Sequence, residues 1–171
     1  SFRTLKQNTH LKIFILEQKV LIMSSKINYS RTIHTKTLYP KRDELSLLSI
    51  DKNNIHSELP NVSKTIEMFN MEIEWRKMWN LEDSITRTNT NHKLFILLAN
   101  NEPLGHVWFN DGFLYNAFVS CERKDGDSVW FIEESIFEMN RKFLVKKITL
   151  KVDEWNKRAI RFWEKLNFIK E

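Results

Sequence analysis

Residues 151–168 read KVDEWNKRAIRFWEKLNF, and this stretch predicts a short strand, a helix and the start of another strand. Asp153 is placed to begin the helix, because a carboxylate at the N-cap accepts the free amides of the first turn. Apolar residues then recur at spacings of three and four, which gives the helix one apolar face. These residues are Ala159, Ile160, Phe162, Trp163 and Leu166. Asn167 follows where a left-handed residue ends a helix, and Asn tolerates that conformation better than most residues.

The composition of the whole chain is that of a globular domain. It has 171 residues, of which 42% are hydrophobic and 29% charged, enough for a single domain with a full core. The most apolar early run, residues 11–23, is broken by Glu17, Gln18 and Lys19. A spanning helix needs about 20 nearly unbroken apolar residues, and a signal peptide needs a small-residue cleavage site, so we expect neither. Cys121 is the single cysteine, which favours a reducing cytoplasm.

The net charge of +5 is distributed unevenly along the chain. Residues 1–42 carry +8, residues 43–92 carry −4 and residues 93–171 carry +1. We therefore expect a poorly ordered or appended basic segment over residues 1–25, with Met23 as a candidate natural start, and one domain over residues 26–171. A basic segment can also bind nucleic acid. No aromatic–basic recognition motif accompanies it, so a nucleic-acid adaptor ranks last among the functions considered.

The order of the remaining elements predicts a mixed α/β (α+β) domain. Residues 93–99, KLFILLA, are nearly continuously apolar, as in a strand covered on both faces. Asp111 and Gly112 supply the positive φ angles of a two-residue hairpin turn. Pro40 suits the first turn of a helix that runs to about Ile50. The pattern then predicts strands over 26–33, 93–99, 104–109, 113–120 and 147–152 and from Phe168, and helices over 40–50, 61–79 and 129–143, with a polar loop over 80–92.

The last helix resembles a signature of the GNAT superfamily, whose members move acyl groups from coenzyme A to amines. The matching residues are Asn156, Arg158, Ala159, Ile160, Phe162, Glu164, Lys165, Leu166 and Phe168. The chain departs from the signature at Trp163, where the family usually has Tyr, and at Asn167, where it usually has Gly. The motifs cover about residues 93–171, and the earlier half agrees in element order only.

The resemblance implies a GNAT-like, mainly antiparallel central sheet of about six strands with helices on both faces. The family's usual seventh strand has no counterpart after the last predicted strand. Either the sheet is one strand short, or a partner subunit in a homodimer supplies the missing neighbour.

A second match lies in the loop RKDGDS, residues 123–128, which resembles the family's phosphate-binding turn at Arg123 and Gly126. Amides at a helix N-terminus and the helix dipole favour a pyrophosphate there. The resemblance implies that the cofactor, acetyl-CoA or another acyl-CoA, is bound by Arg123, Lys124, Asp125, Gly126, Asp127 and Ser128. Asp125 and Asp127 are negative, so a charged loop that caps an ordinary helix is the alternative.

The resemblance also implies a place for the pantetheine arm, beside the end of the strand over residues 113–120. Phe118, Val119 and Ser120 are expected to bind it through their backbone. Asn156 and Trp163 of the last helix are further expected cofactor contacts, with N-capping as the alternative role of Asn156.

Acyl transfer needs a proton donor for the leaving thiolate and a base for the amine. Trp163 cannot be that acid, because its indole N–H does not ionise near neutral pH. Tyr115 is the candidate acid and Glu122 the candidate base, ahead of Asp111 and His106. Solvent as the donor and a protein that binds acyl-CoA but catalyses poorly are the alternatives. Cys121 has no activating partner pattern, and the scattered histidines do not predict a metal site.

The sequence therefore predicts an N-acetyltransferase that moves an acetyl group from acetyl-CoA to a primary amine in a ternary complex. A catalytically weak acyl-CoA-binding or regulatory module is the alternative. The acceptor, a small molecule or a peptide, is not specified by any motif. The charge of −4 over residues 43–92 favours a cationic acceptor.

Overall fold

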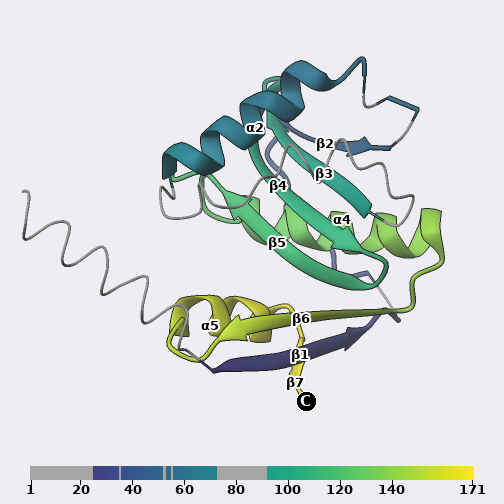
Figure 1. Ribbon diagram of the computed structural model, residues 1–171, viewed down its shortest axis with the longest axis vertical. Coiled ribbons are helices and arrows are strands. Elements are labelled where there is room, and N and C mark those ends of the chain that lie inside the picture. The colour runs from purple at the N-terminus through teal and green to yellow at the C-terminus, as the bar shows by residue number, and fades with distance from the viewer. Residues whose placement is uncertain (1–24, 35, 52, 55, 73–91) are drawn as a thin grey trace, which may run out of the picture.

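One sheet of seven strands organises the part of the chain that the computed structural model describes, residues 25–34, 36–51, 53–54, 56–72 and 92–171 (Figure 1). Its strand order is β2-β3-β4-β5-β6-β1-β7. The strands are β1 (Lys26–Thr32), β2 (Leu45–Ile50), β3 (His92–Ala99), β4 (Glu102–Asn110), β5 (Phe113–Val119), β6 (Lys147–Asp153) and β7 (Ile169–Lys170). The helices are α2 (Leu59–Glu72), α4 (Asp127–Phe143) and α5 (Lys157–Lys165). Neighbouring strands are antiparallel except β5 and β6, which run parallel.

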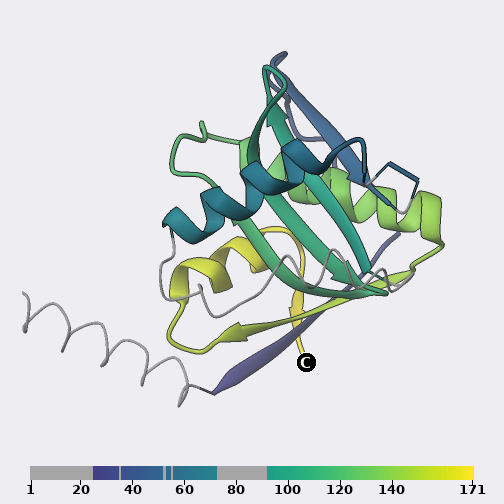
Figure 2. The same cartoon turned by 45° about the horizontal axis from the view of Figure 1, so that its top comes forward.

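Helices cover both faces of this sheet, as the two views in Figures 1 and 2 show. On one face Val62 of α2 packs in a cluster with Ile96 and Trp108. On the other face, residues of α4 and α5 share a larger core with Phe95 and other strand residues. Phe95 and Ile96 are adjacent, point to opposite faces and are both fully buried. The prediction from KLFILLA, a strand covered on both faces, is therefore confirmed.

The helix expected over residues 40–50 is wrong, because residues 45–50 form strand β2. This strand pairs antiparallel with β3, in a register that places Leu48 opposite Ile96. Leu45 and Leu47 contact the larger core, whereas Leu48 and Ile50 contact the cluster under α2. Apolar residues on both faces remove the alternation that identifies a strand, and a short apolar run then reads equally as a helix.

The expectation of about six strands is also corrected, because β2 adds a seventh strand to those predicted, and so is the expectation of a strand missing beside the last ones. Strand β1 lies between β6 and β7, with Tyr29 opposite Leu150 on one side and opposite Lys170 on the other. The chain's own N-terminal strand therefore fills the position that the sequence left either empty or to a partner subunit. The observation that motivated a homodimer is thus explained within one chain.

The starts of all three described helices differ from the sequence prediction, and α4 begins at Asp127, two residues before its predicted start. Asp153 ends β6 and binds Lys26, with 2.7 Å between Nζ and Oδ1, so it is not the N-cap of α5. Asn156 takes that position, and its Oδ1 accepts the amide of Ala159 at 3.1 Å. Helix α2 begins at Leu59, two residues before the predicted start. The predicted end of that helix, residues 73–79, and most of the loop after it lie outside the described residues, as do residues 1–24.

The hairpin between β4 and β5 uses its two turn residues differently. Asp111 has φ 50°, as predicted, but Gly112 is not in the left-handed region. Gly112 is required for space instead, because a Cβ there would lie 2.5 Å from the carbonyl oxygen of Lys147. The turn therefore packs directly against the start of β6. In contrast, Asn167 has φ 64°, and the left-handed end of α5 is confirmed.

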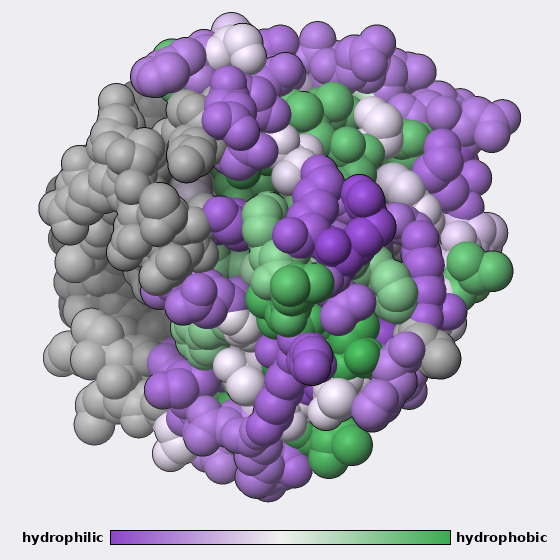
Figure 3. Space-filling model, turned by 90° about the vertical axis from the view of Figure 1, so that its right-hand side faces the viewer, coloured by the Kyte–Doolittle hydropathy of each residue, from purple (hydrophilic) through white to green (hydrophobic). Residues whose placement is uncertain are grey.

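The surface shows no large apolar face among the residues described. Their exposed large hydrophobic side chains are Leu38, Leu59, Leu144, Trp155 and Ile169, which belong to different elements and loops. On the face in Figure 3, apolar groups are interspersed with polar ones. Isolated exposed apolar residues of this kind are ordinary. None of the described helices is long and apolar enough to cross a membrane.

Candidate functional site

The two parallel strands of the sheet separate soon after they meet. Phe113 at the start of β5 pairs with Thr149 of β6, and the amide of Thr149 donates to the carbonyl oxygen of Gly112 at 2.8 Å. Both strands are described along their whole length, and this is the one position at which their Cα atoms pair. The last part of β5 therefore has a partner strand on one side only, and backbone groups on its other side face a gap.

The register of β4 and β5 determines which backbone groups face this gap. The amide of Ser120 donates to the carbonyl oxygen of Leu104 at 2.8 Å. Because hydrogen-bonded residues alternate along an antiparallel ladder, Phe118 also directs its backbone groups toward β4, whereas Ala117 and Val119 direct theirs away. Of the three residues that the sequence suggested, Val119 alone is thus placed to bind a ligand through its amide. Ala117 was missed, because only the register distinguishes it from its neighbours.

The loop after β5 leads directly into the N-terminus of α4. Gly126 takes the N-cap position with φ 87°, which favours glycine, and a Cβ there would meet no atom within 4 Å. A glycine offers no side-chain oxygen to the amides of the first turn. The Asp127 amide donates to the Lys124 carbonyl oxygen, and the amides of Ser128 and Val129 lie at the positive end of the helix dipole. An anionic group bound beside Gly126 stays a prediction.

Asp127 does not face this opening. Its side chain is 1% exposed and accepts two hydrogen bonds from Arg42, at 3.0 Å from Nε and 2.8 Å from Nη2. The same carboxylate accepts the amide of Lys124 at 2.9 Å, and the Asp127 amide donates to the Lys124 carbonyl oxygen at 3.2 Å. The Asp127 side chain therefore has a structural role in place of the expected cofactor contact: it connects the Lys124 amide of the loop to Arg42.

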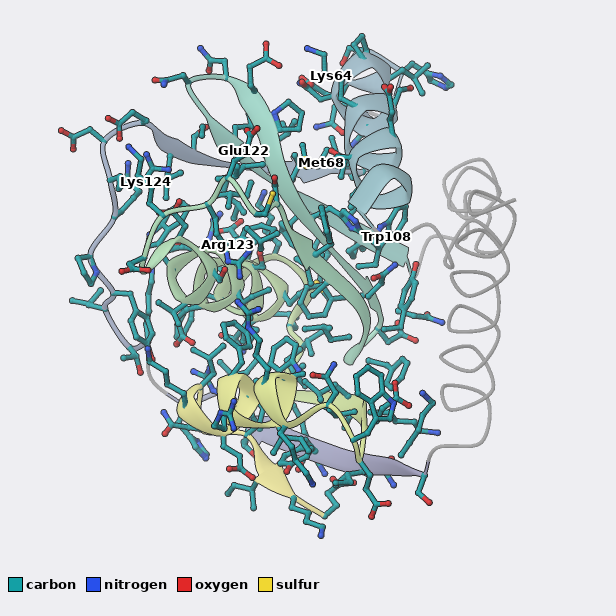
Figure 4. All side chains as sticks on the ribbon, turned by 90° about the vertical axis from the view of Figure 1, so that its left-hand side faces the viewer. Lys64, Met68, Trp108, Glu122, Arg123 and Lys124 are labelled. Carbon is teal, nitrogen blue, oxygen red and sulfur yellow. The ribbon has the colours of Figure 1, made fainter. Side chains whose placement is uncertain are left out.

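The other loop residues differ in how much they are exposed. Arg123 is half-buried, and its Nη1 donates to the carbonyl oxygens of Ser120 at 3.1 Å and Val119 at 3.4 Å. Lys124 and Asp125 are exposed, and Ser128 is half-buried in the first turn of α4. Figure 4 shows Arg123 and Lys124 on the same side of the molecule as Glu122. Lys124 is thus the loop cation with a side chain directed to solvent.

Helix α5 contributes less than the sequence suggested. Trp163 is 8% exposed and packs edge-on against Phe162 and Phe168, with ring centroids 5.0 Å and 5.4 Å apart. It belongs to the core, which the apolar spacing of the helix already indicated. Asn156 uses its Oδ1 as an N-cap, so only its Nδ2 can still donate to a ligand.

The candidate acid and base lie on one strand and the loop after it. Between the pairs Trp108–Asn116 and Phe109–Leu114, strand β5 has one extra residue, Tyr115. This bulge directs the Tyr115 ring to the face under α2, 6.2 Å from the ring of Trp108. Burial raises the pKa of Tyr115 well above its usual value, so the phenol keeps its proton.

Glu122, the candidate base, is exposed and follows β5, and its amide donates to Ser120 Oγ at 3.3 Å. The two weaker candidates lie elsewhere. Asp111 is in the turn at the opposite end of β5, and His106 is fully buried with its ring 5.8 Å from that of Phe118. Cys121 is exposed beside Glu122. Nowhere in the described ranges do three or more His, Cys, Asp or Glu side chains gather to hold a metal ion.

Solved structures share this arrangement of strands and helices. An aminoglycoside acetyltransferase from an uncultured soil metagenomic sample superimposes with a TM-score of 0.57 at 16% identity, over 72% of this chain and 87% of that one. GCN5-related N-acetyltransferases from Kribbella flavida and Sphaerobacter thermophilus give TM-scores of 0.58 and 0.56, at 7% and 12% identity, over 86% and 85% of this chain. The fold is that of the GNAT N-acetyltransferases.

The likeness to these proteins is one of fold, at sequence identities of 16% or less. The chain spans 55% of the Kribbella protein and 48% of the Sphaerobacter protein, about half of each. A conserved protein of unknown function from Staphylococcus epidermidis also shares the fold, with a TM-score of 0.55 at 14% identity. No family model matches the sequence, and no curated protein matches it. At these identities the likeness establishes the GNAT fold and leaves the reaction to be argued from the site.

Proposed function

We propose that this protein is an acyl-CoA-dependent N-acyltransferase that moves an acetyl group from acetyl-CoA to a primary amine in a ternary complex. One observation carries the proposal. The gap between β5 and β6 leads to the glycine-capped N-terminus of α4, so an extended ligand with a pyrophosphate can bind along one edge and at one helix end. Relatives in fold that are named as acetyltransferases support the same assignment.

The residues at this place fit such a ligand. The backbone groups of Ala117 and the amide of Val119 suit the amides of a pantetheine arm, since they are directed away from β4. The first-turn amides of α4 and the open space at Gly126 suit a pyrophosphate, and Lys124 adds a positive charge. Asn156 follows the end of β6 by three residues, and its Nδ2 is a donor suited to the same ligand.

When bound, acetyl-CoA supplies an acyl group activated as a thioester. In this proposal the neutral phenol of Tyr115 donates a proton to the departing thiolate, and the phenolate takes a proton back from the nitrogen of the new amide, which restores the phenol. Glu122 accepts a proton from the incoming ammonium group, so that the amine attacks in its neutral form. Trp163 takes no part in proton transfer and keeps α5 packed on the core.

Calorimetry tests the binding half of the proposal. Wild-type protein is titrated with CoA and with acetyl-CoA, and Gly126→Val should weaken both strongly, because the new side chain enters the open space that the phosphates need. Leu144→Val is the matched control, since Leu144 has φ 57° at the opposite end of α4 and suffers the same kind of backbone strain. Absence of CoA binding by the wild type at millimolar ligand refutes the proposal.

A second candidate function is an acyl-CoA-binding module with little catalysis. The observation that favours it is Trp163, a core residue at the position where the resembled family carries its tyrosine. Release of free CoA thiol in the presence of a panel of primary amines separates the two functions. Turnover that is lost in Tyr115→Phe supports the enzyme, whereas CoA binding without thiol release by any amine supports the module.

A further inference from the structure

A single arginine connects the segment between β1 and β2 to the loop before α4. Arg42 is 25% exposed and binds both oxygens of the buried Asp127 carboxylate. Asp127 Oδ2 in turn accepts the amide of Lys124 at 2.9 Å. Arg42, Asp127 and the Lys124 amide thus form a continuous chain of hydrogen bonds behind the loop. Its first two members, Arg42 and Asp127, are 85 residues apart in sequence.

The charges in this chain matter to any anion at the front of the loop. Asp127 is the first residue of α4 and would repel a phosphate at the same helix end. Burial alone would raise the pKa of Asp127, but the hydrogen bonds from Arg42 and from the Lys124 amide hold its pKa below the usual value, so the carboxylate stays ionised. A fixed negative charge at a phosphate site is tolerable only when a fixed positive charge compensates it.

We propose that Arg42 is a positioning residue for the pyrophosphate of acyl-CoA. It neutralises Asp127 and, through that carboxylate, draws the Lys124 amide to the back of the loop. The remaining amides near Gly126 then face outward in one fixed arrangement. The inference rests on the proposed function, and it explains why a loop with an aspartate in the first helical turn can still bind an anion.

A purely structural role for Arg42 makes a different prediction. If Arg42 only anchored the segment before β2, its loss would lower stability and affect every ligand equally. If it compensates Asp127, its loss should weaken ligands that carry phosphates and leave pantetheine, which has none, nearly unaffected. Removal of the Asp127 charge should then restore the lost affinity.

The experiment compares four variants by calorimetry with CoA and with pantetheine, and by urea unfolding. Arg42→Met removes the charge and the donors, and Arg42→Lys keeps the charge without the two-point geometry. The double variant Arg42→Met/Asp127→Asn removes both charges. Arg141→Met is the matched control, because Arg141 binds Glu138 near the other end of the same helix.

We expect Arg42→Met to weaken CoA binding roughly tenfold, as one uncompensated charge near a dianion should. The double variant should recover most of the lost CoA affinity. Arg42→Lys should have a CoA affinity between those of Arg42→Met and the wild type, and Arg141→Met should bind CoA as tightly as the wild type. If Arg42→Met does not fold, Arg42→Lys decides by its selectivity for CoA over pantetheine. Wild-type protein that fails to bind CoA overturns the proposed function itself. Wild-type binding with equal losses for both ligands, or with no loss, overturns the role of Arg42 alone.

Discussion

Removal of Arg31 should destabilise the protein far more than removal of an exposed arginine on α4. The Arg31 side chain is 7% exposed, and its partner Glu133 in α4 is 2% exposed. Two hydrogen bonds of 2.6 and 2.7 Å join them, and the amide of Thr37 also donates to Glu133 at 3.2 Å. In Arg31→Met the Glu133 carboxylate stays buried and loses the counter-charge that both of its oxygens bind.

Breaking one side of such a pair costs about 3–5 kcal/mol, because the remaining charge is desolvated and unpaired. The double variant Arg31→Met/Glu133→Gln should recover much of this cost, since the introduced amide is neutral and its side-chain oxygen can still accept the Thr37 amide. The matched pair is Arg141 and Glu138 of α4, where Arg141 is 67% exposed. An exposed pair contributes about 0–1 kcal/mol, so Arg141→Met should change the free energy of unfolding little.

Urea unfolding followed by tryptophan fluorescence measures both pairs in one assay, with the difference between single and double variants as the coupling energy. For a domain of this size, each kcal/mol also shifts the thermal midpoint by about 2–4 °C. A loss for Arg31→Met no larger than for Arg141→Met would refute the reasoning. It would mean that water reaches Glu133 in solution or that the loop around Thr37 relaxes.

Three further predictions follow from other contacts. Gly112→Ala should lower the free energy of unfolding by about 2 kcal/mol or more, because its Cβ would lie 2.5 Å from the carbonyl oxygen of Lys147. Gly126→Ala should lower it by only about 1 kcal/mol, through backbone strain. The urea midpoints of the two variants test this difference. Burial raises the pKa of both Tyr29 and Tyr115, so the folded state keeps phenol protons that the unfolded chain loses above about pH 10. The free energy of unfolding should thus fall above this pH, and Tyr115→Phe should flatten that fall; an equal slope in the variant contradicts this. A circularly permuted chain can begin at Tyr39, connect Glu171 to Ser25 by a short glycine-rich turn and end at Leu38. It should fold with a similar circular dichroism spectrum, because the Glu171 amide already donates to the Asn28 carbonyl oxygen at 2.9 Å and Leu38, at the new end, is 84% exposed. An unfolded spectrum counts against the strand order described.

The second half of the fold was predictable because its signals are local. The apolar run of β3, the Asp111 turn, the spacing of α4 and α5 and the left-handed Asn167 each involve residues within one or two helical turns of one another. Local chemistry of this kind specifies an element without reference to the rest of the chain. The motif resemblance then added a mainly antiparallel sheet with helices on both faces, which the structure confirms.

The first half was less predictable, since its structure depends on distant partners. LSLLSI became a strand because β3 offers it an open edge and helices cover both of its faces. The place of β1 between β6 and β7 depends on pairing with residues at the far end of the chain. Nothing within a few residues of either segment specifies these contacts.

The candidate site shows the same division. Gly126 carries a local signal, and the structure places it at the N-cap with a positive φ. The roles of Asp127 and Asn156 were each open between two interpretations. Asp127 binds Arg42 and Asn156 caps α5 through the Ala159 amide, while a cofactor contact of Asn156 through Nδ2 stays a proposal. Arg42 had no signal at all, because an isolated arginine in a loop does not indicate its partner. The roles proposed for Tyr115 and Glu122 stay predictions.

The position of β1 also sets the order in which the sheet can be completed during synthesis. Lys26 binds Asp153, 127 residues later, and Tyr29 binds Glu164, 135 residues later. At about 5–20 residues per second, the first strand waits on the order of ten seconds before its neighbours leave the ribosome. During that time it is an unpaired strand that carries Ile27 and the ring of Tyr29, and other chains or chaperones can bind it. Such distant pairing also slows refolding, and moving this strand next to β7 in sequence should shorten both delays.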